Sequence, residues 1–174
     1  RLTPDQRILV ERVGAAAQQL NMPVYIVGGV VRDLLLERPM MDFDIVVEGD
    51  ATRLGKQLVA AYGGKLTVHQ KFFTAKWTPA DGTALDLISA RSETYAVPAA
   101  LPDVLPGDME SDLKRRDFTI NTLAIRLDGE TRGELLDRCG GLRDLRNGSI
   151  RTLHDCSFID DPTRMVRAVR FEQR

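Results

Sequence analysis

The chain has 174 residues and a formal net charge of −1; 43% of its residues are hydrophobic and 6% are aromatic. This length suits one domain, or one domain and the start of another, with a largely aliphatic core. Two cysteines exclude a disulfide framework, no stretch approaches the roughly 20 apolar residues of a membrane span, and the near-zero charge excludes a global basic field.

The first part of the chain predicts alternating helices and strands. Thr3 and Pro4 have the chemistry of an N-cap and a first helical position, and apolar residues then recur at helical spacing to about Leu20. Gly63 and Gly64 end an amphipathic helix. The expected elements are a helix over 3–20, a strand over 24–27, a helix over 30–36, a strand over 42–47 and a helix over 51–62.

The second part predicts more strands and one extended loop. Residues 79–82 have hairpin-turn chemistry, and the proline-rich residues 95–107 predict a loop long enough to be a working segment. Residues 116–125 mix helix and strand signals. The other expected elements are strands 65–69, 72–78, 84–88, 135–137 and 149–153, a helical turn at 141–146 and a helix from Pro162 onward. This order predicts an α/β (α+β) fold with a small mixed sheet.

The run GGVVRD at residues 28–33 is followed by an apolar segment that carries Asp42 and Asp44. Two residues apart on a strand, these carboxylates point to the same face, and hard oxygen ligands of this kind suit Mg²⁺. Gly28 and Gly29 let backbone N–H groups approach a phosphate, and Arg32 adds a fork of donors. Taken alone, the glycine pair also fits an ordinary turn, and the two carboxylates also fit a solvated strand end. Together they favour a metal-dependent nucleotidyl-transfer site.

A second constellation, KRRDFTIN, occupies residues 114–121. The structural interpretation is a charged turn that enters a core helix, with Phe118, Ile120 and Leu123 buried. The functional interpretation is that Arg116 holds phosphates while Asp117 accepts a hydrogen bond from a ribose hydroxyl. Taken alone, the segment favours the structural interpretation.

A third constellation, DDPTRMVRAVR, occupies residues 160–170. Pro162 suits the first helical position, which makes Asp161 the expected N-cap. Arginines every three residues are usually a solvated basic face of a helix. The alternative is that Asp161 and Arg164, one turn apart, present an acceptor and donor edge that matches the edge of a nucleobase.

Asp86 interrupts the apolar strand 84–88, where a carboxylate disfavours sheet formation. It either completes a metal site or hydrogen-bonds a loop at the strand edge, and both interpretations stay open. The remaining unusual side chains predict structural roles: His69 and His154 without a nucleophile pattern, Trp77 in the core or sheet, and Cys139 and Cys156 as buried small hydrophobes.

In this order, over residues 24–171, the three constellations resemble the class II tRNA nucleotidyltransferase and bacterial poly(A) polymerase family. The resemblance implies a polymerase-β-like nucleotidyltransferase head over residues 1–145 and the start of a helical neck over 146–174. It implies that Asp42 and Asp44 hold Mg²⁺ and are catalytic. Asp86, from its place in the apolar strand 84–88, is a third catalytic candidate. The nucleotide-binding residues that the resemblance implies are Gly28, Gly29, Arg32, Arg116, Asp117, Asn121, Asp161, Arg164, Arg167 and Arg170.

Two positions depart from the pattern of this family. Asp160 stands where members often have Glu, and Thr122 stands where many have Ala. Neither change affects the expected metal site. Residues 95–106 match the family's flexible loop, which is linked to addition of the final adenosine.

The implied activity is template-independent transfer of CMP or AMP from CTP or ATP to the 3′ end of tRNA, by a two-metal mechanism. Poly(A) polymerase activity is the alternative within the family, and a non-catalytic nucleotide- or RNA-binding module is the alternative from another class. A cytoplasmic protein with no membrane contact is expected, and the oligomeric state stays open. A start at Arg1 without Met, and a helical pattern that stops uncapped, predict a piece of a longer protein.

Overall fold

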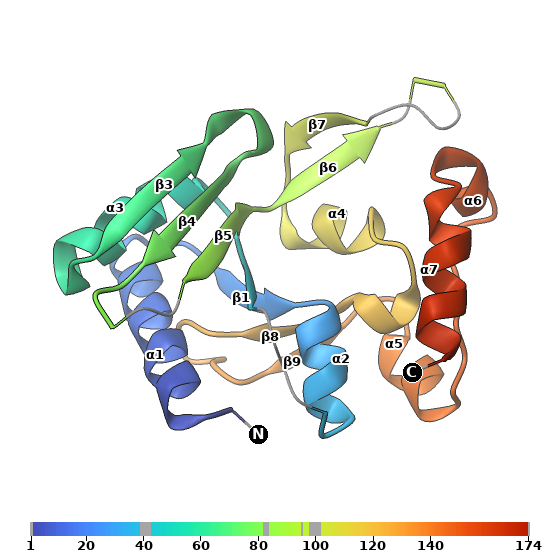
Figure 1. The fold of residues 1–174 in the computed structure, drawn as a ribbon, viewed down its shortest axis with the longest axis horizontal. Coiled ribbons are helices and arrows are strands. Elements are labelled where there is room, and N and C mark those ends of the chain that lie inside the picture. The colour runs from blue at the N-terminus through green and yellow to red at the C-terminus, as the bar shows by residue number, and fades with distance from the viewer. Residues whose placement is uncertain (1, 39–42, 82–83, 95, 98–101, 174) are drawn as a thin grey trace.

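In a computed structural model, which describes residues 2–38, 43–81, 84–94, 96–97 and 102–173, the chain forms a seven-stranded sheet in the order β3-β4-β5-β2-β1-β8-β9 (Figure 1). Strands β2 and β5 are parallel and all other neighbours are antiparallel, so the predicted small mixed sheet is confirmed. The strands are β1 (Val24–Val27), β2 (Asp44–Val47), β3 (Lys65–His69), β4 (Thr74–Thr78), β5 (Leu85–Ser89), β8 (Leu123–Arg126) and β9 (Leu135–Asp137).

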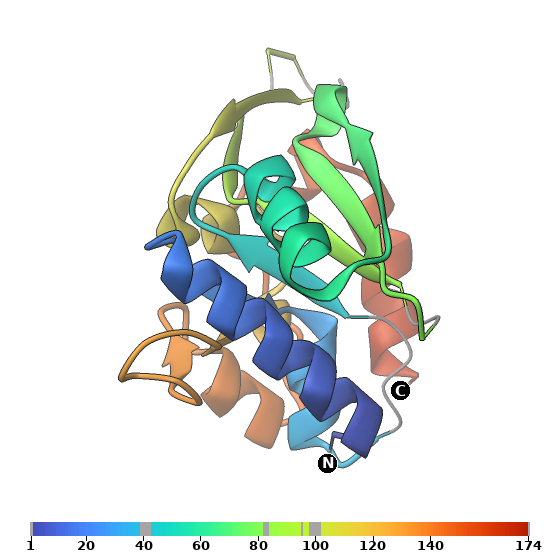
Figure 2. The same cartoon turned by 90° about the vertical axis from the view of Figure 1, so that its left-hand side faces the viewer.

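Two helices cover one face of this sheet, α1 (Pro4–Gln19) and α3 (Ala51–Tyr62), and both lie in front of it in Figure 2. Helix α1 begins with a capping box, in which Thr3 and Gln6 satisfy each other's backbone N–H groups. Leu54 and Leu58 of α3 pack with the buried Trp77 in the main core. The predicted core position of Trp77 is confirmed.

The central strands are buried on both faces, which explains their uninterrupted apolar sequences. In β1, Val24 and Ile26 belong to the main core, whereas Tyr25 and Val27 face a second cluster. Helix α4 (Met109–Lys114) closes this second cluster with Met109 and Leu113. Near the starts of β2 and β5, Asp44 is half-buried and Asp86 is exposed.

A separate two-stranded sheet pairs β6 (Arg91–Thr94) with β7 (Asp103–Pro106). The prediction of a continuous loop over residues 95–107 was therefore wrong at its end, because β6 supplies a pairing partner that the local sequence does not reveal. Residues 95 and 98–101 of this predicted loop lie outside the described residues, as do Pro39, Asp42 and Gly82 of other predicted elements.

The C-terminal part is helical and lies beside α2 (Gly29–Leu35) and α4 in Figure 1. Its elements are the 3-10 helix Thr119–Asn121, α5 (Gly141–Arg146), α6 (Ser157–Asp160) and α7 (Thr163–Glu172). The predicted strand over 149–153 was wrong, since only Thr152 forms a single bridge, to Phe118. No described helix is both long and apolar enough to cross a lipid bilayer.

Several boundaries differ from prediction for local reasons. The strand predicted over 72–78 begins only at Thr74, because a second 3-10 helix, Gln70–Phe72, ends with Phe73 in the left-handed region at φ 54°. The predicted burial of Phe118, Ile120 and Leu123 is confirmed. The predicted burial of the cysteines was wrong, since Cys156 is exposed and Cys139 is half-buried.

Candidate nucleotide-binding site

A polar cleft of about 390 Å³ gathers the three sequence constellations. Six arginines and four carboxylates line it, so its formal balance is positive and suits a polyanion. The lining residues are Gly29, Arg32, Asp44, Glu93, Arg115, Arg116, Asp117, Asn121, Asp161, Arg164, Arg167, Arg170 and Phe171. Of the predicted site residues, Gly28 lies behind this lining and Asp86 lies outside it.

The glycine turn makes room for an arginine. Gly28 has φ 75° and ψ −132°, a conformation that other residues rarely adopt, and it precedes the first residue of α2. A Cβ at Gly28 would lie 2.6 Å from Arg116 Nη1, whereas one at Gly29 would make an ordinary contact with Arg32 at 3.5 Å. The two glycines therefore serve differently: Gly28 permits the approach of Arg116.

Arg32 is buried and held on three sides. Its Nε and Nη2 donate to Asp33 Oδ1 at 2.9 and 2.8 Å, and its Nη1 donates to Asn121 Oδ1 at 2.6 Å. Its guanidinium carbon also lies 4.8 Å from the centre of the Phe171 ring, a cation–π contact. These contacts join α2, the 3-10 helix at Asn121 and α7, and they fix the guanidinium before any ligand binds.

Asp117 has one satisfied and one unsatisfied oxygen. Oδ1 accepts hydrogen bonds from Phe118 N at 2.8 Å and Asn121 Nδ2 at 2.9 Å. Oδ2 lies 2.7 Å from Arg167 Nη2 as an ion pair, yet within the described part of the chain it receives no hydrogen bond of good geometry. A buried acceptor of this kind is costly unless a ligand completes it.

Asp161 and Arg164 lie together at the start of α7. Arg164 is buried; its Nη1 donates to Ser157 Oγ at 2.6 Å, its Nη2 donates to the Arg115 carbonyl at 3.2 Å, and its Nε lies 3.7 Å from Asp161 Oδ2. The predicted cap was wrong by one residue, because Pro162 is the N-cap and α7 begins at Thr163. Asp161 still caps the helix from one residue earlier, since its Oδ1 accepts from Thr163 N at 3.0 Å.

One expected metal ligand, Asp44, and the catalytic candidate Asp86 lie on neighbouring strands. Asp44 of β2 and Asp86 of β5 are directly opposite in the parallel register, so their side chains leave the same face of the sheet. Asp86 is exposed and lies 3.3 Å from Lys76 Nζ. Asp42 lies outside the described residues, and within those residues no three His, Cys, Asp or Glu side chains gather as a metal site.

Sequence reasoning missed four residues around this cleft. Glu93, Arg115 and Phe171 line it, and the buried Asp112 of α4 holds Arg115 and Arg116 from behind. The spacing of Asp112 to these arginines, three and four residues, is a helical signal that could have found it. Glu93 and Phe171 carry no local signal, because their place depends on the pairing of β6 and on the packing of α7.

The comparison with known proteins extends over most of the chain. The family described as the poly A polymerase head domain matches residues 24–151. The A-adding tRNA nucleotidyltransferase of Halalkalibacterium halodurans is 46% identical over 173 residues, which are 99% of this chain and 40% of that protein. This chain thus spans less than half the length of that relative.

Solved structures agree with this comparison. The structure described as apo form II of a CCA-adding enzyme is 46% identical, has a TM-score of 0.95, and is matched over 100% of this chain and 41% of its own. The CCA-adding enzyme of Thermotoga maritima, complexed with tRNA-CCA, is 45% identical with a TM-score of 0.86, over 100% of this chain and 39% of its own. On the family match and on these identities, the chain belongs to the poly(A) polymerase head-domain family, together with relatives named as A-adding tRNA nucleotidyltransferases.

Proposed function

We propose that this chain carries the nucleotidyl-transfer site of an enzyme that adds CMP or AMP, from CTP or ATP, to the 3′ end of tRNA without a nucleic-acid template. The observation that supports this most directly is the single cleft in which the three constellations meet. It offers arginines for phosphates, a buried acceptor for a ribose hydroxyl and an Asp–Arg pair for a base edge. The names of the similar proteins point to the same reaction.

The order of these groups along the cleft suggests how a nucleoside triphosphate lies in it. Arg32 and Arg116 meet at the glycine turn, where their fixed guanidiniums suit the triphosphate. Asp117 Oδ2 is ion-paired with Arg167 but accepts no hydrogen bond of good geometry within the described residues, so it suits a ribose hydroxyl. Arg164 has five N–H donors, of which two are used by hydrogen bonds to the protein, so others remain for a base. Arg167, which pairs with Asp117, and Arg170 line the same cleft.

Mg²⁺ fits the donor set at the start of β2. Asp44 and Asp86 leave the same face of adjacent strands and offer hard oxygen ligands, and Asp42 lies two residues before Asp44 in the sequence. We propose Asp42 and Asp44 as the metal ligands, with Asp86 as a third carboxylate that exchanges its ion pair with Lys76. When bound, such ions lower the pKa of an attacking hydroxyl and neutralise charge on a leaving pyrophosphate.

The protein's own contribution is to position the reacting groups and to neutralise the charge of the phosphates. The primer 3′ hydroxyl attacks the α-phosphate, and pyrophosphate leaves. Arginines fixed before the substrate binds compensate the phosphate charge without reorganisation at the moment of reaction. Contacts to ribose and base hold the α-phosphate in line with the primer, which converts a bimolecular encounter into an oriented one.

Relatives named for A addition, CC addition and CCA addition are similarly identical to this chain, at 46%, 45% and 46%, so the proposal covers transfer of both AMP and CMP. Poly(A) polymerase activity remains the alternative within the family. We also propose a cytoplasmic location, in keeping with two free cysteines, and a boundary between head and neck after residue 145.

Primer extension tests the proposed function. The full-length protein would be incubated with Mg²⁺, with ATP, CTP or both, and with tRNA ending before CCA, in C, or in CC. Growth of only the CC-ended tRNA by one residue indicates A addition, growth of all three indicates CCA addition, and long tails indicate a poly(A) polymerase. No growth on any of the tRNAs would refute the transferase proposal and favour a binding module.

Asp44→Asn tests the metal assignment in the same assay. We expect transfer to be abolished while calorimetry still detects NTP binding, because the arginines remain. Asp81→Asn is the matched control, since it makes the same chemical change at an exposed residue that pairs only with Arg12 among the described contacts. Retained turnover in Asp44→Asn would overturn the assignment.

A further inference from the structure

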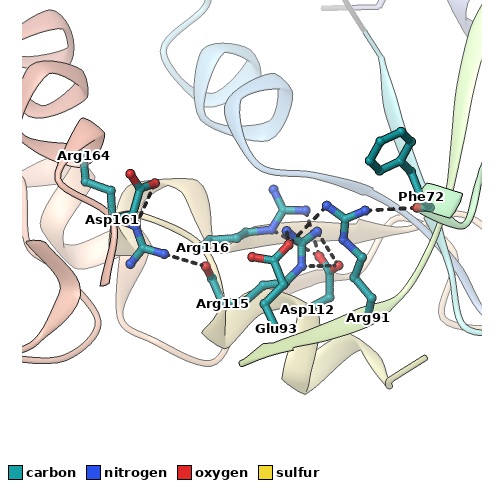
Figure 3. Close-up of polar contacts among 8 residues, drawn as sticks. All are labelled: Phe72, Arg91, Glu93, Asp112, Arg115, Arg116, Asp161 and Arg164. Carbon is teal, nitrogen blue, oxygen red and sulfur yellow. Dashed lines mark hydrogen bonds and ion pairs between the residues drawn. The ribbon is translucent and has the colours of Figure 1, made fainter. Parts of the chain in front are cut away.

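A buried carboxylate behind the cleft holds two consecutive arginines, one on each oxygen. Asp112 of α4 is 0% exposed. Its Oδ1 accepts from Arg115 Nε and Nη2 at 3.0 and 2.7 Å, and its Oδ2 accepts from Arg116 Nε and Nη2 at 3.3 and 2.8 Å. Figure 3 shows Asp112 beside the two guanidiniums. Asp112 does not line the cleft, so its effect on a bound nucleotide has to be transmitted by the arginines.

The two arginines lead to opposite ends of the cleft. Arg116 points its Nη1 at the glycine turn, against Gly28. The backbone carbonyl of Arg115 accepts the hydrogen bond from Arg164 Nη2 at 3.2 Å, and Arg164 lies at the Asp161 end. Asp112 is therefore a common support for the phosphate end and the base end of the proposed site.

A second carboxylate holds the same arrangement from β6. Glu93 Oε1 lies 3.0 Å from Arg115 Nη1 and 3.1 Å from Arg91 Nη2, while Arg91 Nη1 donates to the Phe72 carbonyl at 3.0 Å (Figure 3). Arg115 is thus fixed through both of its terminal nitrogens. A guanidinium held by two nearly buried carboxylates has little freedom to change its position, and its backbone carbonyl is restrained with it.

We propose that Asp112 is a positioning residue that fixes the separation between Arg116 and Arg164, and with it both the rate of transfer and the choice of nucleotide. The proposal rests on the proposed function, because it takes Arg116 to meet phosphate and Arg164 to meet the base. Without the Asp112 carboxylate, two adjacent guanidiniums repel each other and the Arg115 carbonyl loses one of its restraints. Both ends of the nucleotide would then be misplaced together.

The test is Asp112→Asn in the full-length protein, with Glu110→Gln as the matched control on the same helix. Glu110 is exposed and pairs with Lys114 at 2.6 Å, so its variant makes an equivalent change away from the cleft. The Asn side chain offers one acceptor oxygen in place of two and turns an N–H group toward the other arginine. We expect kcat/KM for the nucleotide that the wild type adds to fall about a hundredfold, because small misplacements of reacting groups are this costly.

Nucleotide selectivity separates positioning from a merely structural role. The ratio of kcat/KM for the correct nucleotide to that for each of the other three does not depend on how much of the protein is folded. We expect this ratio to fall about tenfold in Asp112→Asn and to stay at the wild-type value in Glu110→Gln. An unchanged ratio in soluble, folded Asp112→Asn would overturn the proposal.

A second variant keeps the test decisive if Asp112→Asn does not fold. Arg115→Lys keeps the charge but cannot hold Asp112 and Glu93 at once, so it should lower selectivity while Arg116 keeps its contact with Asp112. Unchanged selectivity in this variant would also overturn the proposal. Two outcomes distinguish failure of the proposed function from failure of this inference. A wild type that extends no tRNA in primer extension refutes the proposed function, whereas an active wild type together with unchanged selectivity in folded Asp112→Asn refutes the positioning role alone.

Discussion

Gly28→Ala tests how the glycine turn serves the cleft. The new Cβ would lie 2.6 Å from Arg116 Nη1, so that nitrogen has to retreat by about 0.8 Å to reach an ordinary contact of 3.4 Å. The φ of 75° adds backbone strain of about 1–3 kcal/mol for a residue other than glycine. We expect urea denaturation to show a loss of this size. Since a misplacement of 1 Å can cost about 100-fold, kcat/KM should fall about 10- to 100-fold.

Two comparisons make this prediction specific. Gly29→Ala is the control for stability, because its Cβ would meet Arg32 at an ordinary 3.5 Å and alanine favours a helix; its unfolding free energy should change by no more than about 0.5 kcal/mol or rise. In a double-mutant cycle, Gly28→Ala should cost activity only while the Arg116 side chain is present. Wild-type stability together with wild-type kcat/KM in Gly28→Ala would refute the reasoning.

Three further predictions concern specificity and stability. Arg164→Lys cannot hold its two protein acceptors as a fork, so misincorporation in primer extension should rise about tenfold; an unchanged error rate would count against its role at the base. Burial raises the pKa of Asp144, but hydrogen bonds from Thr119 and Arg151 outweigh it and hold the pKa below its ordinary value. This carboxylate therefore stabilises the fold above its ordinary pKa and ceases to do so as the pH falls through the lowered value. Asp144→Asn should lower Tm at neutral pH and flatten the acid side of a Tm-against-pH curve, and parallel curves for the two proteins would contradict this. Trp77→Ala, in the main core, should lower the free energy of unfolding in urea by about 3–5 kcal/mol. A loss below about 1 kcal/mol would show that the core relaxes into the cavity left by the indole.

Elements with a strong local signal could be predicted from the sequence. Thr3 and Pro4 start α1 through their own side chains, and Gly63 ends α3 in the left-handed region. The buried apolar run of β1 and the alternating sequence of β3 both have the predicted bounds. In each case the determining interactions lie within one turn or one strand, so no knowledge of the tertiary structure is needed.

Elements that depend on distant partners could not be predicted. Strand β7 exists because β6 pairs with it, and the six-residue α4 is held by Met109 and Leu113 in a cluster built by other strands. Residues around Thr152 have strand composition but find only one bridge. The same applies to the site: the motif residues could be named from the sequence, whereas the supporting carboxylates Asp112 and Glu93 became visible only from their contacts.

The position of β1 between β2 and β8 has a consequence for synthesis of the protein. Arg126 of β8 hydrogen-bonds to Tyr25 of β1 at a sequence separation of 101 residues, and Arg32 hydrogen-bonds to Asn121 at a separation of 89. A nascent chain can therefore pair β1 with β2 early, but one edge of β1 stays without its partner until β8 has emerged. An unpaired edge on an apolar strand favours association with other chains. Chaperone contact, or slow translation before residue 123, would thus decide how much of the protein ever acquires its cleft.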